Sequence, residues 1–191
     1  MRSFPQLLLI CGMPATGKTT FGNWLRDEHG YVHLDLESRD CLEANGLPQF
    51  WPERIWNLDE SQLTDFFAYL RSLNSGTVMT WAFHTDLIPL VRDLVRHGCQ
   101  PWWFEGDRLA SRKAHEMRKR VIKQGVAQPG EPNMQAYDSY VASLVQHWAE
   151  IAPIFGDNII HTLHPDDTRL PYKAIWDCIL HMSIDNPHDQ R

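Results

Sequence analysis

The segment QLLLICGMPATGKTT, residues 6–20, limits the fold of this chain more than any other stretch. Its uninterrupted apolar run, closed by Gly12, is typical of a strand buried on both faces in a parallel sheet. The residues from Lys18 to His29 read as a helix that ends at Gly30. A buried strand that passes through a short glycine-containing loop into a helix is the first unit of an α/β fold.

The rest of the chain repeats this alternation. Further strands are predicted at 31–35, 77–83, 101–105 and 158–163, and helices at 59–73, 87–95, 107–123, 134–156 and 170–182. Residues 36–58 carry prolines and aromatic rings and are predicted to form short helices and loops. The pattern predicts an α/β fold with a five-stranded, mainly parallel sheet and helices on both faces. The length of 191 residues suits a single domain spanning 1–191.

Composition narrows the class of protein. The formal net charge of −6 argues against broad, non-specific binding to nucleic acids or anionic membranes. The four cysteines are scattered without a CxxC pair, which favours reduced thiols over a zinc site or a disulfide framework. The apolar run 7–11 is shorter than the roughly 7–15 residues of a secretory signal, and no run is long enough to cross a bilayer. A cytoplasmic protein without a membrane partner is the expectation.

The loop after the first strand matches the pattern G-x-x-x-x-G-K-[ST] in full. Successive backbone N–H groups in such a loop turn inward around a phosphate, and the following helix adds its dipole. Lys18 would reach the β- and γ-phosphates, and the Thr19 hydroxyl would bind Mg²⁺. The predicted nucleotide-binding residues are Gly12, Met13, Pro14, Ala15, Thr16, Gly17, Lys18, Thr19 and Thr20. The motif predicts ATP and Mg²⁺ as cofactors, with GTP open as the nucleotide; the alternative is a plain strand–helix turn.

With this early motif, five strands and a charged helix after the fourth, the chain resembles the P-loop small-molecule and polynucleotide kinases. Gluconate, shikimate, chloramphenicol and polynucleotide 5′-kinases share the layout. The resemblance covers nearly the whole chain in architecture but is specific only at the phosphate loop. It implies a P-loop NTPase fold, the strand order 2-3-1-4-5, and a helical lid at about residues 108–132.

The resemblance also suggests roles for the second strand end, HLDLESRD. An Asp at this place faces the acceptor or the metal shell, and an Arg a few residues later contacts the substrate. Asp35 is therefore the candidate base, substrate contact and metal ligand, and Arg39 a candidate substrate contact. The alternative is that Asp35 caps a helix and that Glu37 and Arg39 are solvated surface charges.

The third strand end, TWAFHTD, departs from the family pattern, which ends in a Mg²⁺-binding Asp. Either Asp35 serves the metal alone, or hydrolysis and transfer are weak. His84 is a candidate contact in the acceptor pocket, and Trp56 a candidate wall of it. At the fourth strand end, Glu105 and Asp107 are interpreted first as a loop and a helix cap, with a metal or substrate role as the alternative.

A basic cluster follows the fourth strand. Seven of the 18 Lys and Arg residues fall within 108–123, where Glu116 is the one acidic residue: Arg108, Arg112, Lys113, Arg118, Lys119, Arg120 and Lys123. A triphosphate would supply the missing counter-charge, and in the resembling kinases this region is the lid whose arginines close over the phosphates. Arg112 and Arg118 are the predicted catalytic arginines, with Arg112 also binding the nucleotide. The alternative is a solvated basic face.

The sequence thus predicts a kinase that moves the γ-phosphate of ATP to a hydroxyl of a small molecule. Two alternatives stay open. The acceptor could be the 5′ end of a nucleic acid, because Asp35 with a downstream Arg also resembles polynucleotide kinases. The protein could instead be a nucleotide-binding switch without an acceptor, as the atypical third strand end would allow.

Overall fold

The computed structural model describes residues 6–47, 59–73, 75–125 and 134–184, with the backbone alone at 118–125 and 184. Five strands form one sheet in which every pairing is parallel. They are β1 (Leu7–Gly12), β2 (Val32–Asp35), β3 (Thr77–Trp81), β4 (Gln100–Gly106) and β5 (Ile159–Leu163). The order β2-β3-β1-β4-β5 confirms the predicted architecture.

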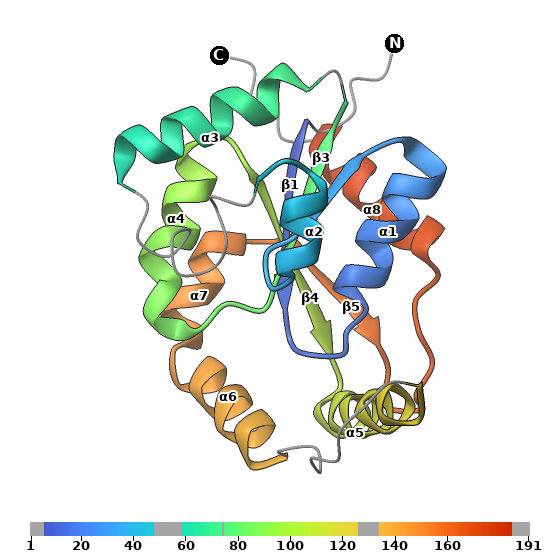
Figure 1. Ribbon diagram of the computed structural model, residues 1–191. Helices are drawn as coiled ribbons and strands as arrows, with labels where there is room; N and C mark the ends of the chain where they lie inside the picture. The colour runs from blue at the N-terminus through green and yellow to red at the C-terminus, as the bar shows by residue number, and fades with distance from the viewer. Residues whose placement is uncertain (1–5, 48–58, 74, 126–133, 185–191) are drawn as a thin grey trace.

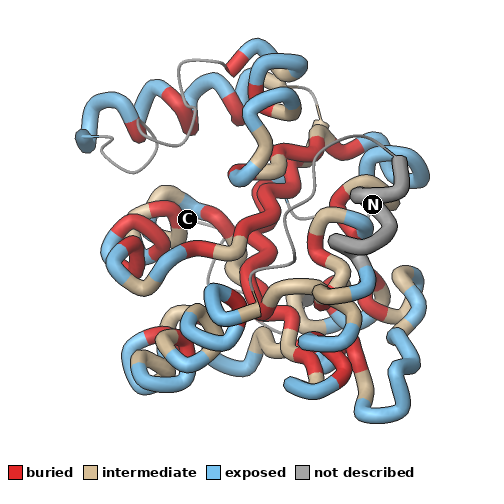
Figure 2. The backbone as a smooth tube through the Cα atoms, turned by 60° about the horizontal axis from the view of Figure 1, so that its bottom comes forward, coloured by how far each residue is buried: buried red, intermediate tan, exposed pale blue. Residues whose placement is uncertain are grey.

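The centre of the sheet is β1, which pairs with β3 on one side and β4 on the other. All six of its residues are buried, as the apolar run predicts for a strand covered on both faces. Leu8 and Ile10 point into one core and Leu7, Leu9 and Cys11 into the other, because successive side chains alternate across a sheet. Figure 2 shows the buried strands enclosed by helices whose outer sides are exposed.

Helices cover both faces of the sheet (Figure 1). One face packs against α1 (Lys18–His29) and α8 (Tyr172–Ile184), which contribute apolar residues such as Phe21, Leu25 and Trp176. The other face packs against α3 (Glu60–Ser72), α4 (Ile88–Arg96) and α7 (Trp148–Phe155). The short helix α2 (Arg39–Ala44) follows β2, and the 3₁₀ turn η3 (Thr85–Leu87) follows β3.

Two helices lie at the carboxyl end of the sheet, below it in Figure 1: α5 (Arg108–Gly125) and α6 (Met134–Gln146). The single helix predicted for 134–156 is two helices, α6 and α7, because the chain turns at His147. The His147 ring contacts the Ser143 carbonyl at 2.9 Å across this turn. The apolar stripe stays continuous across the turn, which is why the sequence alone suggested one helix. The turn lets α7 pack on the sheet while α6 extends past its end.

Among the described residues, none of the helices combines the length and the apolar character needed to cross a bilayer.

Candidate active site: the phosphate loop and the pocket beside it

The loop between β1 and α1 has a backbone that only particular residues can adopt. Gly12 has a φ of 138°, and a Cβ at this position would lie 2.1 Å from the Phe104 carbonyl oxygen. Gly17, which precedes α1, has a φ of 94°, and no side chain caps the helix. The first glycine therefore allows the close approach of β1 and β4, and the second leaves the helix N-terminus open toward a ligand.

Buried hydrogen bonds hold the loop in this shape. The Thr16 hydroxyl donates to the Met13 carbonyl at 2.7 Å, and the Thr162 hydroxyl of β5 donates to the Thr16 carbonyl at 2.9 Å. From the segment before α8, Arg169 donates through Nη2 to the Ala15 carbonyl at 3.0 Å. Since these bonds come from within the loop, from β5 and from the segment before α8, the loop conformation is set by the tertiary fold.

The motif lysine folds back along the loop. Lys18 is buried, and its Nζ donates to the carbonyls of Gly12 at 2.9 Å and Met13 at 2.7 Å. These bonds keep the ammonium group at the mouth of the loop. The loop, the start of α1 and Lys18 together form a positively polarised cradle suited to an anion.

Next to the cradle, the Thr19 hydroxyl donates to Asp35 Oδ2 at 3.0 Å. The other carboxylate oxygen, Oδ1, accepts from the Glu37 backbone N–H at 3.0 Å. A hydroxyl and a carboxylate side by side are hard oxygen donors of the kind that Mg²⁺ prefers. In the described part of the chain no three His, Cys, Asp or Glu residues are grouped to hold a metal by themselves. The pair therefore fits Mg²⁺ that is carried largely by nucleotide phosphates.

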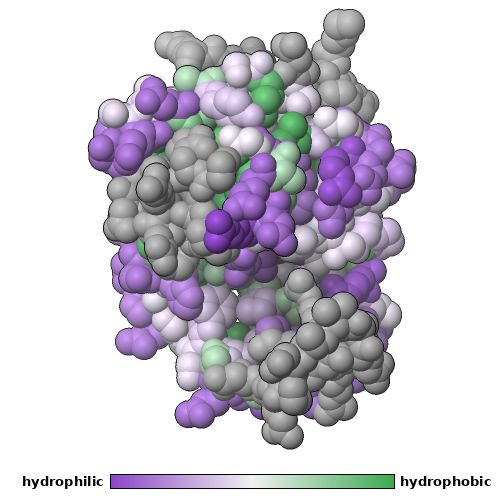
Figure 3. Space-filling view, in the orientation of Figure 1, coloured by the Kyte–Doolittle hydropathy of each residue, from purple (hydrophilic) through white to green (hydrophobic). Residues whose placement is uncertain are grey.

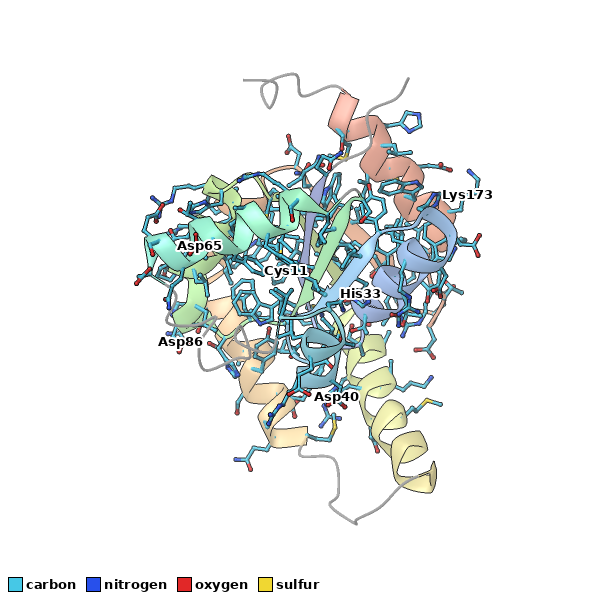
Figure 4. All side chains as sticks on the ribbon, turned by 45° about the horizontal axis from the view of Figure 1, so that its top comes forward. Cys11, His33, Asp40, Asp65, Asp86 and Lys173 are labelled. Atoms are coloured by element: carbon cyan, nitrogen blue, oxygen red, sulfur yellow. The ribbon has the colours of Figure 1, made fainter. Side chains whose placement is uncertain are left out.

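A buried polar chain supports this side of the site. His33 lies between the sheet and α1 (Figure 4), with its Nδ1 2.9 Å from Asn23 Oδ1 and its Nε2 2.9 Å from Thr80 Oγ1. Because Asn23 Oδ1 can only accept, Nδ1 carries the proton and Nε2 accepts from Thr80. Burial lowers the pKa of His33 to about 4, so the ring is neutral near pH 7. The neutral ring joins α1, β2 and β3, close enough to Asp35 for the charge of that carboxylate to act on its pKa.

A cavity of about 930 Å³ opens from the cradle, and Figure 3 shows the molecule hollowed below its centre. The cradle side is lined by Pro14, Ala15, Gly17, Lys18, Thr19, Thr20 and Asn23, while Gly12, Met13 and Thr16 lie buried behind it. The pocket is also lined by Glu37, Ala82, His84, Ala136, Tyr137 and Tyr140. Ala114, His115, Arg169 and Tyr172 complete the lining. One pocket thus contains the cradle together with aromatic rings and a carboxylate.

The predicted site residues fall into three groups. Lys18, Thr19, Asp35 and His84 lie at the cradle or along the pocket. Arg39 does not line the pocket and instead pairs with Glu43 on α2, with Nε 2.6 Å from Oε1. Trp56 and the Arg118 side chain lie outside the described residues, as do residues 126–132 at the end of the predicted lid.

Arg112 of α5 forms a two-pronged ion pair with Asp138 of α6. The Nε–Oδ1 distance is 2.9 Å and the Nη2–Oδ2 distance is 3.1 Å, and both side chains are about half exposed. The guanidinium raises the acidity of its partner, so the pKa of Asp138 lies below its usual value. Lys113 forms a second exposed pair, with Asp167. The basic cluster thus finds part of its counter-charge within the protein.

Glu37 and Tyr140 are among the pocket residues that sequence reasoning missed. Glu37 accepts from the Ala82 backbone N–H at 3.1 Å through Oε2, and it lines the same pocket as Lys18. The Tyr140 hydroxyl donates to the Phe83 carbonyl at 2.9 Å, and burial, with Glu37 nearby, raises its pKa. The signal for Glu37 was its spacing in DLE, two residues after Asp35, at the end of a strand. No sequence signal pointed to Tyr140, because the apolar and aromatic residues around it on α6 are typical of a helix face that packs on the core.

The third strand ends without an acid, as the sequence suggested. Thr80 and Trp81 are buried, and Asp86 lies on η3, exposed and away from the pocket lining (Figure 4). On the fourth strand, Asp107 caps α5 by accepting from the N–H groups of Leu109 and Ala110, each at 3.0 Å. Glu105 accepts from the Trp103 indole at 2.7 Å and lines a different cavity.

Comparison with solved structures adds the fold relationship. The shikimate kinase from Acinetobacter baumannii in complex with shikimate is 16% identical over 96% of this chain and 97% of its own, with a TM-score of 0.52. A gluconokinase from Sinorhizobium meliloti 1021 is 12% identical over 99% of both chains, with a TM-score of 0.49. No family model matches the chain, and no curated protein does.

The chain has the P-loop kinase fold. The likeness to the shikimate kinase and the strand order agree on this, and at such low identity they establish the fold alone.

Proposed function

We propose that the protein is an ATP-dependent kinase that transfers the γ-phosphate to a hydroxyl of a small molecule. The observation that carries this proposal is the continuity of the pocket. Its cradle presents Lys18, Thr19 and a helix N-terminus, and the rest of its lining presents Glu37, His84 and Tyr140. A nucleotide-binding switch needs only the cradle. A phosphotransferase needs a second polar wall beside it, and the cavity of about 930 Å³ offers room for both substrates.

Each residue then has a role that its contacts support. Lys18 and the backbone N–H groups of α1 neutralise the β- and γ-phosphates, where charge develops during transfer. Thr19 and Asp35 would hold Mg²⁺, which would supply positive charge to offset the negative charge of the phosphates. Glu37 orients the acceptor hydroxyl, because its carboxylate lines the pocket and is held by the Ala82 N–H. The sequence interpretation gave both duties to Asp35; the second carboxylate allows them to be divided.

The transfer step balances as follows. The acceptor oxygen forms a bond to the γ-phosphorus in line with the bond that breaks, the one to the β-phosphate oxygen. The acceptor proton passes to the Glu37 carboxylate, and ADP leaves. Arg112 and Arg118 remain the proposed lid arginines that stabilise charge on the transferred group. For Arg112 this requires exchange of Asp138 for phosphate.

The acceptor wall favours ring-shaped neutral molecules. The His84 and Tyr140 rings meet edge to face, with centroids 5.8 Å apart, and small Ala82 and Ala136 leave space beside them. Aromatic faces of this kind pack against sugar rings and planar molecules. Trp81 and Phe83 are buried in the core and do not supply this surface.

The test is a screen with ATP labelled at the γ-phosphate against sugars, nucleosides, ring alcohols and 5′-hydroxyl oligonucleotides. We expect label on one small-molecule class, and Lys18→Ala should reduce the rate at least about a hundredfold. Arg26→Ala, on the exposed face of α1, is the matched control and should transfer normally. If only the oligonucleotides were labelled, the acceptor would be the 5′ end of a nucleic acid instead of a small molecule. ATP binding without any labelled acceptor would favour the switch.

A further inference from the structure

A second cavity, of about 490 Å³, borders α6 about one turn further along the helix than the residues that line the proposed active site. Its floor is apolar and consists mainly of Trp103 and Ile159 of the sheet, Trp148 of α7, and Val141 and Leu144 of α6. Tyr137 and Tyr140 of the same helix α6 face the first pocket. The two cavities therefore share α6 as a wall but have different linings. The volume of the second cavity lies within the range of about 300–1,000 Å³ that is typical of small-ligand sites.

Opposite charges line this second cavity without meeting each other. Glu105, on β4, is half-buried and accepts one hydrogen bond, from the Trp103 indole at 2.7 Å. Arg108, the first residue of α5, also lines the cavity. Within the described part of the chain, neither Glu105 nor Arg108 has an ion-pair partner within 4.0 Å. An anion and a cation thus border one apolar floor, and both have hydrogen-bonding capacity left.

From this arrangement we propose that the second cavity binds a small zwitterion, an α-amino acid with an apolar side chain. The ammonium group pairs with Glu105, the carboxylate pairs with Arg108, and the side chain lies among Trp148, Leu144 and Val141. A single exposed ion pair adds little affinity, so the apolar floor supplies much of the binding and the charges select the ligand. The inference goes beyond the proposed kinase function and does not depend on it.

The test uses three probes with the same phenyl body: L-phenylalanine, 2-phenylethylamine and 3-phenylpropanoate. Each is titrated into the full chain without ATP, and binding is followed by the NMR signal of the Trp103 indole N–H, assigned with Trp103→Phe. We expect L-phenylalanine to bind at least about tenfold more tightly than either singly charged probe. Equal affinities for the three probes, or no shift of the Trp103 signal, would overturn the proposal.

Two charge variants assign the contacts. Glu105→Gln should weaken L-phenylalanine and 2-phenylethylamine about tenfold and leave 3-phenylpropanoate unchanged. Arg108→Gln should weaken L-phenylalanine and 3-phenylpropanoate and leave 2-phenylethylamine unchanged. Equal weakening of all three probes by either variant would contradict the assignment.

Two further variants separate this cavity from the active site. Val145→Trp narrows the cavity at a half-exposed lining residue and should abolish binding of all three probes. Glu37→Gln, which alters an exposed lining residue of the first pocket alone, should leave every affinity unchanged. Loss of probe binding in Glu37→Gln would move the site to the first pocket and refute the proposal, whatever the outcome of the phosphate-transfer screen.

Discussion

On the phosphate side of the pocket, Lys18 and Thr16 donate to backbone carbonyls at 2.7–2.9 Å from buried positions. On the proposed lid side, Arg112 of α5 meets Asp138 of α6 through side chains that are about half exposed. The first arrangement is buried and bonded to the backbone, and a change in it leaves a buried group without a partner or creates a clash. The second is solvated and screened by salt. We therefore expect loop variants to alter folding, and variants of the Arg112–Asp138 pair to leave folding intact.

The largest expected loss of stability is at Gly12. A Cβ there would lie 2.1 Å from the Phe104 carbonyl oxygen, and φ is 138°, so Gly12→Ala forces β1 and β4 apart. We expect the free energy of unfolding in urea to fall by more than about 4 kcal/mol. Gly30→Ala is the matched control. The φ of Gly30 is also positive, at 70°, but a Cβ at this position would have no other heavy atom within 4 Å. The free energy of unfolding of Gly30→Ala should therefore fall by only about 1–2 kcal/mol. If both variants lost the same free energy of unfolding, the close approach of β1 and β4 would not be the reason that Gly12 is required.

The next test separates the two carboxylates on the phosphate side. Asp35→Asn removes the negative charge and one of the two carboxylate oxygens beside Thr19, and it should lower transfer about 100- to 1,000-fold, with ATP still bound and a higher Mg²⁺ requirement. Glu37→Gln should lower transfer comparably without changing the Mg²⁺ requirement. Rates measured across a Mg²⁺ titration decide this, with Asp40→Asn on exposed α2 (Figure 4) as the control. An unchanged Mg²⁺ requirement in Asp35→Asn would remove the metal role of Asp35.

Stability against pH tests the buried chain near Asp35. His33 has a pKa of about 4 in the fold and an ordinary value of 6.5, so between these pH values the unfolded chain binds the extra proton. The contribution of neutral His33 to the free energy of unfolding is therefore fully present above pH 6.5. It declines by about 3 kcal/mol as the pH falls toward 4. His33→Gln should flatten the rise in urea stability between pH 4 and pH 6.5. The same slope in variant and wild type would show that His33 becomes charged within the fold.

The smallest expected effect is on the lid side. Asp138→Asn removes the carboxylate that holds Arg112. Because an exposed ion pair contributes little to stability, the midpoint of urea unfolding should stay unchanged. The KM for ATP should fall a few-fold, because Arg112 no longer exchanges one anion for another. Asp93→Asn removes a comparable exposed pair, with Arg96 on α4 far from the pocket, and should leave KM unchanged. A marked loss of stability in Asp138→Asn would mean that the pair fastens α5 to α6.

Sequence reasoning worked where a feature depends on neighbouring residues. Strand positions followed from apolar runs such as 7–11, and the Gly12–Thr19 motif predicted a loop between a buried strand and a helix, as observed. It was weaker where a turn interrupts a helix without breaking its apolar stripe, as at His147. It gave no means of dividing the duties of Asp35 and Glu37, because their distances to Thr19 and Ala82 depend on how β2, α1 and β3 pack.

The sequence by itself determined the phosphate loop, the strand order implied by the family resemblance, and the lack of an acid at the end of the third strand. Only the tertiary structure decided which face each polar side chain joins. Side chains alternate along β4, so Trp103 and Glu105 share one face while Trp102 and Phe104 share the other. The packing of helices on each face then decided that Glu105 borders the second cavity, and the packing beyond the end of β2 decided that Glu37 lines the first. Alternation is local and readable, but the partner of each face is set by contacts between residues far apart in the chain.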